Sequence, residues 1–201
     1  MSTLSDLDIA QLLAPYLPQA PMGLCRKLSV YLDVLVKWNA FTNLTAIRDP
    51  GEIVQRHFGE SLFAARHLDR KTLTLLDFGS GAGFPGLPMA LLRPDIAVTL
   101  AESQNKKSAF LREAVRSLEL STEIWPNRVE NMPLMRKFDT IALRAVDHMD
   151  EAIGAALPRA ASGILLLAGS APELPAEFES PTTIPVPNTR SSVLVLARRI
   201  S

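Results

Sequence analysis

The chain has 201 residues, with 21 basic and 21 acidic side chains and a formal net charge of zero. This balance argues against broad nonspecific binding of nucleic acid, which needs a strong positive excess, although it allows a local basic patch. No apolar run approaches the roughly 20 residues that cross a bilayer, and the first eight residues lack the basic region of a secretory signal. The single cysteine, Cys25, fits a reducing compartment. We therefore expect a cytoplasmic protein without a membrane segment.

Helical patterns fill the first 70 residues. The predicted helices run over residues 5–17, 22–40 and 49 to about 65. Ser5 is a suitable N-cap for the first helix, and Asp49 and Glu52 flank Pro50 as a capping box that opens the third. His57 lies on the apolar side of the third helix, where packing is the simpler interpretation and a functional role the alternative. We predict that residues 1–70 form a helical segment packed on the core.

From residue 71 onward strands and helices alternate, which is the pattern of a parallel sheet. The predicted strands are 73–78, 97–101, 123–125, 140–143 and 163–167, and the helices lie near 85–92, 106–118 and 149–157. Two closing strands, near 182–186 and 192–197, would add an antiparallel edge. The sequence therefore predicts a Rossmann-like α/β domain over residues 71–201, with a mainly parallel sheet.

A glycine-rich turn joins the first strand to the helix that follows. Gly79, Gly81 and Gly83 remove side chains where a ligand must touch the backbone. Asp77 stands at the carboxyl end of the strand, two residues before the first glycine. Its carboxylate would repel a diphosphate and attract the ammonium and sulfonium of S-adenosylmethionine, by about 1 to 4 kcal/mol at roughly 4 Å. The turn therefore favours S-adenosylmethionine as the cofactor.

A dinucleotide is the alternative ligand of this turn. Gly81, Gly83 and Gly86 also satisfy the pattern G-x-G-x-x-G. Glu102 ends the second strand about 20 residues past the turn, where an acid accepts hydrogen bonds from both ribose hydroxyls of an adenosine. NAD and S-adenosylmethionine share this need. Glu102 therefore supports an adenosine cofactor without choosing between the two.

Two further positions follow strands at the same edge of the predicted sheet. The stretch 127–131 follows the third strand, where adenine would rest. Val129 would pack on the ring, and backbone groups of Val129 and Glu130 would bond its edge. Arg144 ends the fourth strand and is expected to point into the crevice that holds cofactor and substrate. The alternative for Arg144 is a salt bridge to an acid; the candidate acids are Glu102, Glu130 and Asp147.

The absence of certain side chains limits which atoms of a nucleic acid could accept a methyl group. Methylation at pyrimidine C5 needs a cysteine nucleophile, and Cys25 lies in the wrong part of the chain. Methylation of an exocyclic amine or a ribose oxygen usually goes with an Asn/Asp-Pro-Pro-aromatic loop or a lysine base, and neither follows the fourth strand. The three histidines are scattered, so no metal-ligand spacing is present. A purine N7 already has an in-plane lone pair and needs orientation without a general base, so N7 chemistry is compatible with this sequence.

These residues resemble the glucose-inhibited division protein B family, the RsmG-type methyltransferases that modify a guanine at N7 in bacterial 16S rRNA. The resemblance runs from Trp38 to about Val146, with a looser C-terminal part. Its most specific pieces are Trp38-Asn39, Asn43-Leu44-Thr45, Arg48-Asp49-Pro50, Arg56-His57, the turn from Asp77 to Gly86, Arg93-Pro94, Arg128-Val129-Glu130 and Arg144-Ala145. The turn alone would be unspecific, but the ordered series is specific.

The resemblance implies a class I S-adenosylmethionine-dependent methyltransferase fold behind an N-terminal helical segment. It also implies methyl transfer to the guanine at position 527, in standard rRNA numbering, in the decoding-region loop of 16S rRNA. The positions that match Gly79, Phe84, Val129, Glu130 and Arg144 line the cofactor site in that family. The neutral net charge favours the assembled small ribosomal subunit as the substrate particle.

One departure from the family keeps other functions open. The family often carries Lys-Gly-Gln after the fifth strand, where this chain has Ala168-Gly169-Ser170. The change removes a cation that would contact phosphate or substrate. A noncatalytic ribosome-assembly binder is therefore an alternative, beside an NAD(P)-dependent oxidoreductase that uses the glycine pattern. For the methyltransferase we expect Arg144 to orient the cofactor or the guanine, without a metal.

Overall fold

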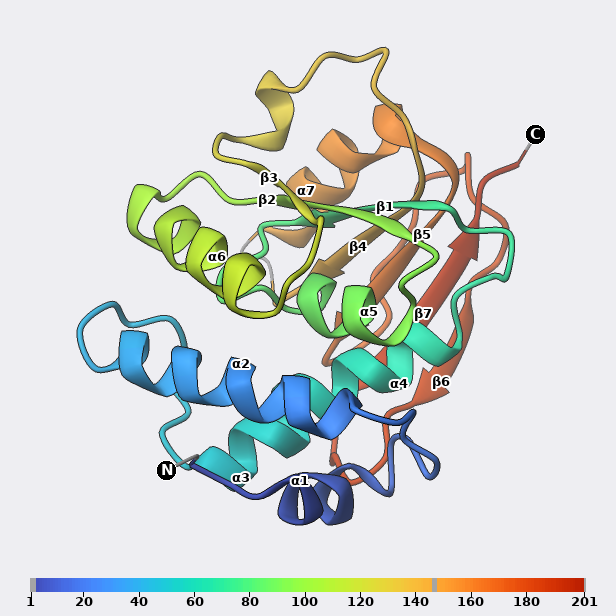
Figure 1. Ribbon diagram of the computed structural model, residues 1–201. Coiled ribbons are helices and arrows are strands. Elements are labelled where there is room, and N and C mark those ends of the chain that lie inside the picture. The colour runs from blue at the N-terminus through green and yellow to red at the C-terminus, as the bar shows by residue number, and fades with distance from the viewer. Residues whose placement is uncertain (1–2, 146–147, 201) are drawn as a thin grey trace.

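A seven-stranded sheet with the order β3-β2-β1-β4-β5-β7-β6 runs through the centre of the molecule (Figure 1). The computed structural model describes residues 3–145 and 148–200. The strands are β1 (Thr74–Phe78), β2 (Ala97–Ala101), β3 (Glu123–Trp125), β4 (Phe138–Arg144), β5 (Ala160–Ala168), β6 (Thr182–Pro185) and β7 (Val193–Arg198). The pairs among β1 to β5 are parallel, whereas β7 pairs antiparallel with both β5 and β6. The predicted mixed sheet with an antiparallel edge is therefore confirmed.

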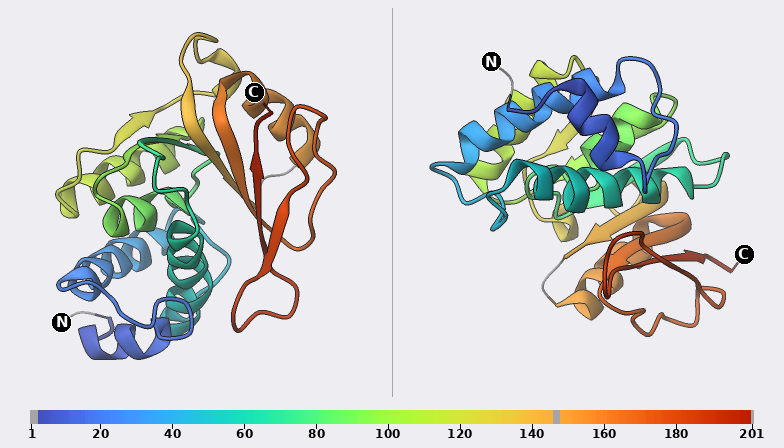
Figure 2. Two further views of the ribbon diagram at one scale, coloured as in Figure 1. Left: turned by 90° about the vertical axis from the view of Figure 1, so that its right-hand side faces the viewer. Right: turned by 90° about the horizontal axis from the view of Figure 1, so that it is seen from below.

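Helices cover both faces of this sheet, as Figure 2 shows from two sides. The helical elements are α1 (Asp6–Leu13), α2 (Leu24–Asn39), α3 (Pro50–Ile53), α4 (Glu60–Arg66), α5 (Gly86–Leu92), α6 (Asn105–Ser117) and α7 (Met149–Ala156), with the short turns η1 (Val54–Gly59), η2 (Val129–Asn131) and η3 (Leu157–Arg159). Successive residues of a strand point to opposite faces. Accordingly, Leu75 joins the apolar cluster under α2 and α4, and Leu76 joins the cluster under α7.

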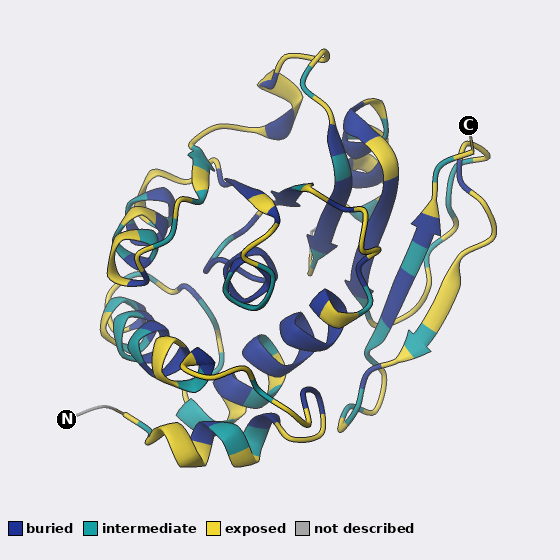
Figure 3. Ribbon diagram, turned by 45° about the vertical axis from the view of Figure 1, so that its right-hand side comes forward, coloured by how far each residue is buried: buried dark blue, intermediate teal, exposed yellow. Residues whose placement is uncertain are grey.

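Burial separates the middle of the sheet from its edge (Figure 3). The middle strands β1 and β4 are buried along most of their length, while β6 at the edge is largely exposed. Among the described residues, no helix combines the length and apolar character that a bilayer crossing requires.

The first 70 residues differ from expectation in two places, because α1 ends at Leu13 and not at residue 17, and the predicted third helix is interrupted. Ser5 and Asp49 cap α1 and α3 as predicted, and the Asp49 side chain accepts a hydrogen bond from the backbone N–H of Glu52 at 2.7 Å. The single helix predicted from residue 49 onward is interrupted, however, by the π-helical turn η1. Such turns insert an extra residue into the helix and often occur at functional sites. This one contains His57 and ends immediately before Glu60.

Candidate cofactor and substrate site

The glycine turn after β1 uses backbone conformations that favour glycine. Gly79, Gly81 and Gly83 all have positive φ angles, which side chains rarely adopt. A Cβ on Gly81 would meet only the Gly79 carbonyl oxygen, at 3.8 Å, so this glycine leaves backbone open to a ligand. A Cβ on Gly83 would lie 2.6 Å from the Tyr31 hydroxyl. The same hydroxyl of α2 donates a hydrogen bond to the carbonyl of Ala82, so the N-terminal segment holds the turn in place.

Asp77 lies beneath this turn and has no exposed surface. Its Oδ2 accepts a hydrogen bond from the backbone N–H of Gly86, at 2.9 Å, while Oδ1 is buried without a partner among the described residues. Burial raises the pKa of this carboxyl to about 7, against the opposing effect of the Gly86 N–H. Asp77 therefore offers an unused acceptor oxygen at the carboxyl end of β1, and its charge changes near neutral pH.

The position of Asp77 weakens the dinucleotide alternative. A diphosphate in a Rossmann fold binds the free N–H groups at the N-terminus of the first helix. Here the first such group, that of Gly86, already bonds the Asp77 carboxylate. A Cβ on Gly86 would also lie 2.4 Å from Leu100, so this glycine serves helix–strand packing. The geometry thus disfavours an anion at the start of α5.

Glu102 follows β2 and faces the glycine turn. Its Oε2 accepts from the Gly81 N–H at 2.9 Å, and its Oε1 accepts from the Gln104 N–H at 2.7 Å. The residue is only 6% exposed, so these bonds fix the carboxylate in place. Each carboxylate oxygen can accept more than one hydrogen bond. Glu102 therefore keeps acceptor capacity beside Gly81, and its role toward the ribose hydroxyls stays a prediction.

The expected adenine position is the 3₁₀ turn η2. Val129 is 3% exposed and packs in the apolar cluster under α7 with Met132 and Phe138, whereas the Glu130 side chain is exposed. The backbone N–H groups of Val129 and Glu130 are the first two of the turn, and the first N–H groups of a helix have no partner within it. The turn can therefore donate backbone hydrogen bonds to a base, as the sequence predicts, and this role stays a prediction.

Arg144 is tied to the N-terminal segment. Its Nη2 donates to Oε2 of Glu60 and to the carbonyl of Arg56, both at 2.9 Å. The side chains of Arg144 and Glu60 are 13% and 5% exposed, so the pair is largely removed from water. The guanidinium carbon also lies 5.9 Å from the centre of the Phe84 ring, at the end of the glycine turn.

The prediction that Arg144 pairs with Glu102 or Glu130 is wrong, because its partner is Glu60. The third candidate acid, Asp147, lies outside the described residues. Glu60 was missed because it comes from the helical segment, 84 residues earlier in the chain. The available signal was its place three residues after His57, on the apolar side of the predicted helix.

His57 also packs on Phe84, the ring over which the guanidinium of Arg144 lies. Its ring stacks on Phe84 with 4.8 Å between centroids, and its Nε2 lies 2.7 Å from the Thr45 hydroxyl oxygen. Burial, and to a smaller extent the charges of Arg144 and Arg56, lower the pKa of His57 to about 3, so the ring is neutral at physiological pH. Its Nδ1 is buried and has no partner in the described part of the chain. His57 packs on Phe84 as expected, although its Nδ1 is not satisfied by any described residue, and a functional role for the ring stays open.

A separate cavity of about 620 Å³ lies at the opposite edge of the sheet. Its lining includes Thr72, Asp139 and Arg198, at or near the ends of strands remote from the glycine turn. The Asp139 carboxylate there is satisfied by backbone N–H groups of Leu73 and Thr74, both at 2.9 Å. The cavity therefore does not coincide with the residues predicted to bind a cofactor.

The family model described as rRNA small subunit methyltransferase G matches residues 24–182. A ribosomal RNA small subunit methyltransferase G of Nitrosomonas europaea is 42% identical over 128 residues, which cover 63% of this chain and 59% of that protein. A relative of the same name from Xanthomonas euvesicatoria is 41% identical over 145 residues, which cover 71% of this chain and 68% of that protein. The aligned part thus spans about three fifths to two thirds of these relatives.

Solved structures share the fold at low sequence identity. MtNAS in complex with MTA and tNA is 10% identical, has a TM-score of 0.59 and is matched over 96% of this chain and 82% of that chain. A ribosomal protein L11 methylase of Lactobacillus delbrueckii is 10% identical, with a TM-score of 0.56 over 73% and 80% of the two chains. P. horikoshii TYW2 in complex with MeSAdo is 18% identical, with a TM-score of 0.52 over 71% and 62%. The fold is that of class I methyltransferases, as the resemblance implied.

Proposed function

Because the chain belongs to the rRNA small subunit methyltransferase G family, we propose that it transfers a methyl group from S-adenosylmethionine to N7 of a guanine in 16S rRNA. The observation that carries the proposal is the glycine turn above a buried carboxyl, with Arg144 held beside Phe84 at the end of that turn. This arrangement offers acceptors for a cationic cofactor and one fixed cation for the substrate.

The donors and acceptors of the described residues match the chemical groups of S-adenosylmethionine. The unpartnered Oδ1 of Asp77 suits the ammonium group, and the open backbone at Gly81 suits close approach of the methionine part. Glu102 is placed for the ribose, and the N–H groups of η2 for the adenine edge. The proposed cofactor residues are therefore Asp77, Gly79, Gly81, Phe84, Glu102, Val129, Glu130 and Arg144.

S-adenosylmethionine supplies an activated methyl group on its sulfonium. The protein then has to orient the guanine, because its N7 lone pair is already available for attack. We assign this orientation to Arg144, whose guanidinium would donate to O6 and leave N7 free. Glu60 fixes the guanidinium, and the neutral ring of His57 packs on Phe84 without adding positive charge near the sulfonium. No side chain has to remove a proton before transfer.

The wider setting of the reaction follows from the same proposal. The substrate particle would be the assembled small ribosomal subunit in the cytoplasm, where shape adds contacts that a chain of zero net charge cannot gain from bulk attraction. Residues 1–70 would act as a helical segment that completes the site of the Rossmann-like domain 71–201, since Tyr31, His57 and Glu60 all contact the site from this segment. The proposed reaction requires no metal.

The test is methyl transfer to small ribosomal subunits that lack this modification. Purified protein is incubated with such subunits and with methyl-tritiated S-adenosylmethionine, and the rRNA is mapped by chain cleavage at 7-methylguanosine. We expect one stoichiometric mark at a guanine of the decoding-region loop. Free 16S rRNA is assayed in parallel to identify the preferred particle. Binding to subunits without any methyl transfer would support the noncatalytic alternative and contradict the proposal.

A further inference from the structure

Arg159 is a buried arginine whose position is not explained by an ion pair. It ends η3, between α7 and β5, and is 2% exposed. None of the salt bridges found among the described residues includes it. Burying a guanidinium without a carboxylate is unfavourable, so the hydrogen bonds that it makes must compensate.

Those hydrogen bonds lead to the turn η2. One terminal nitrogen, Nη1, donates to the carbonyl of Ala155 in α7, at 3.0 Å. The other, Nη2, donates to the carbonyl of Glu130, at 3.2 Å, and to the carbonyl of Met132. The side chain therefore joins α7 to both ends of the segment that follows Val129. A planar guanidinium can bond several carbonyls at fixed angles, whereas the single ammonium of a lysine cannot reproduce this geometry.

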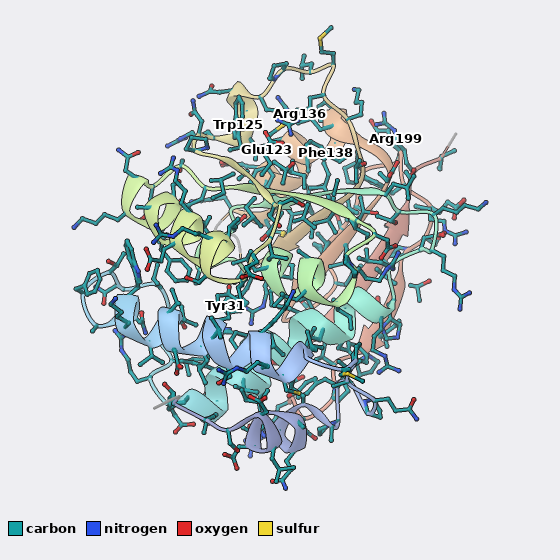
Figure 4. The ribbon with its side chains drawn as sticks, viewed as in Figure 1. Tyr31, Glu123, Trp125, Arg136, Phe138 and Arg199 are labelled. Carbon is teal, nitrogen blue, oxygen red and sulfur yellow. The ribbon has the colours of Figure 1, made fainter. Side chains whose placement is uncertain are left out.

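The segment before η2 is held independently. The indole Nε1 of Trp125, at the end of β3, donates to the carbonyl of Arg128 at 3.1 Å. Figure 4 shows Trp125 close to Glu123, Arg136 and Phe138 at the upper edge of the sheet. The carbonyls of Arg128, Glu130 and Met132 are thus all bonded by protein groups. The first N–H groups of η2 are not needed for these contacts and can serve a ligand.

We propose that Arg159 is a positioning residue for the adenine base of the cofactor. By bonding the carbonyls of Glu130 and Met132, it holds η2 so that the N–H groups of Val129 and Glu130 read the ring edge. Arg159 thereby sets both the affinity and the base selectivity of the cofactor site, without touching the cofactor. This inference rests on the proposed function, because that proposal places adenine at η2.

The test compares two ligands that differ only in the base. Adenine N1 accepts a hydrogen bond, whereas N1 of hypoxanthine carries a proton and donates, so a fixed N–H donor favours adenine. S-adenosylhomocysteine and S-inosylhomocysteine are titrated calorimetrically into wild type and Arg159→Lys. We expect wild type to prefer the adenosyl ligand by at least about tenfold. In the variant, affinity for it should fall at least about fivefold and the preference at least about threefold, with kcat at saturating cofactor within about twofold of wild type.

Arg199→Lys is the matched control. Nη1 of Arg199 donates to the carbonyls of Leu157 and Ala160, at 3.0 and 2.7 Å, so this half-buried arginine bonds η3 and the start of β5 and does not contact η2. Figure 4 labels it on the side of the molecule near the C-terminus. We expect Arg199→Lys to leave the base preference unchanged, and to lower the thermal unfolding midpoint less than Arg159→Lys does because Arg199 is only half-buried.

The outcomes separate this inference from the proposed function. An unchanged base preference in Arg159→Lys would overturn the positioning role, as would an equal loss of preference in Arg199→Lys. If Arg159→Lys does not fold, Arg159→Met, which retains apolar packing volume, is measured in the same way and judged by the same criterion. If wild type itself fails to bind S-adenosylhomocysteine, the proposed function fails instead.

Discussion

Arg144 is the residue on which the proposed chemistry most depends, and its setting shapes how it can be tested. Removing one partner of a buried ion pair leaves the other charge uncompensated, which typically costs about 3–5 kcal/mol. In Arg144→Ala, the Glu60 side chain, which is 5% exposed, would stay buried without a cationic partner. The variant would therefore lose stability together with activity. A variant that keeps the charge separates the two effects.

We predict that Arg144→Lys lowers turnover at least about tenfold at saturating cofactor and subunit, because the compact ammonium lacks the planar, spread donors with which a guanidinium reaches a guanine while it bonds Glu60 and the Arg56 carbonyl. The thermal midpoint should fall by only about 2–4 °C, since Glu60 keeps a cationic partner. Tritiated methyl transfer and thermal unfolding provide the two measurements. Arg136→Lys is the control, because the Arg136–Glu123 pair lies far nearer the surface. Turnover within twofold of wild type would exclude Arg144 from the reaction.

Asp77 and His57 are expected to oppose each other in the dependence of stability on pH. The pKa of Asp77 is raised by burial from 3.8 to about 7, so its contribution to folding stability falls as pH rises between about 4 and 7. The pKa of His57 is lowered by burial from 6.5 to about 3, so its contribution falls as pH decreases from about 6.5 to 3. Each slope is at most about 1.4 kcal/mol per pH unit.

Because the two contributions oppose each other in wild type, replacing either residue should reveal the pH dependence of the other's contribution to the free energy of unfolding. Relative to wild type, the free energy of unfolding of Asp77→Asn should rise with pH between about 4 and 6.5, because the variant lacks the Asp77 carboxyl whose contribution falls over this interval. That of His57→Gln should fall with pH over the same interval. Urea denaturation at pH 4.5, 5.5 and 6.5 measures both differences, and the remaining groups cancel in the comparison. Curves parallel to wild type would show that folding does not shift the pKa of either group.

At the scale of elements, β5 ends at Ala168, where the resemblance to the family implies a lysine. Leu167 pairs with Arg144 in the parallel ladder, so Ala168 lies at the same sheet edge as the proposed substrate site. We predict that Ala168→Lys tightens binding to 16S rRNA severalfold at moderate salt, and steepens the slope of log K against log salt by about one.

The comparison needs a neutral side chain of similar length. Ala168→Gln should leave both the affinity and the salt slope close to wild type, and neither variant should alter cofactor affinity. Filter binding across a series of potassium chloride concentrations supplies the slope. An equal gain from Gln and Lys would mean that contact area, and not charge, is responsible.

Some elements could be predicted from the sequence pattern and others could not. Strands β2 and β3 have the predicted bounds, because short apolar runs between turn residues define them locally. The interruption of the helix from residue 50 to 66 was not predicted, because its apolar positions satisfy a regular helix. The contacts that accompany the π-turn are tertiary: Phe58 packs in the core, and His57 stacks on Phe84.

At the scale of the whole molecule, the helical segment and the sheet share one core. The cluster on one face of the sheet contains Leu28 and Leu62 from the first 70 residues together with Leu75 and Leu100 from the strands. Burial of this shared surface contributes about 25 cal/mol for each Å² removed from water, and neither part can retain it alone. We therefore propose that residues 1–70 are a segment of one folding unit.

We predict a single cooperative unfolding transition for the chain. The two tryptophans report on the two parts, since Trp38 lies in α2 and Trp125 in β3. Fluorescence of Trp38→Phe and Trp125→Phe during urea denaturation should give the same midpoint as circular dichroism of the same variant. A Trp38 signal that changes at lower urea than the sheet would show that the helical segment unfolds separately.

By itself the sequence determined the alternation of strands and helices, the glycine turn and the acids that follow β1 and β2. These are local properties, because strand periodicity, positive φ and an acid at a strand end each depend on a few neighbouring residues. Only the tertiary structure decided that Glu60 partners Arg144, that Asp77 bonds Gly86 beneath the turn and that Arg159 bonds η2. These contacts join residues up to 84 positions apart, and which buried charge meets which partner is set by the packing of the elements.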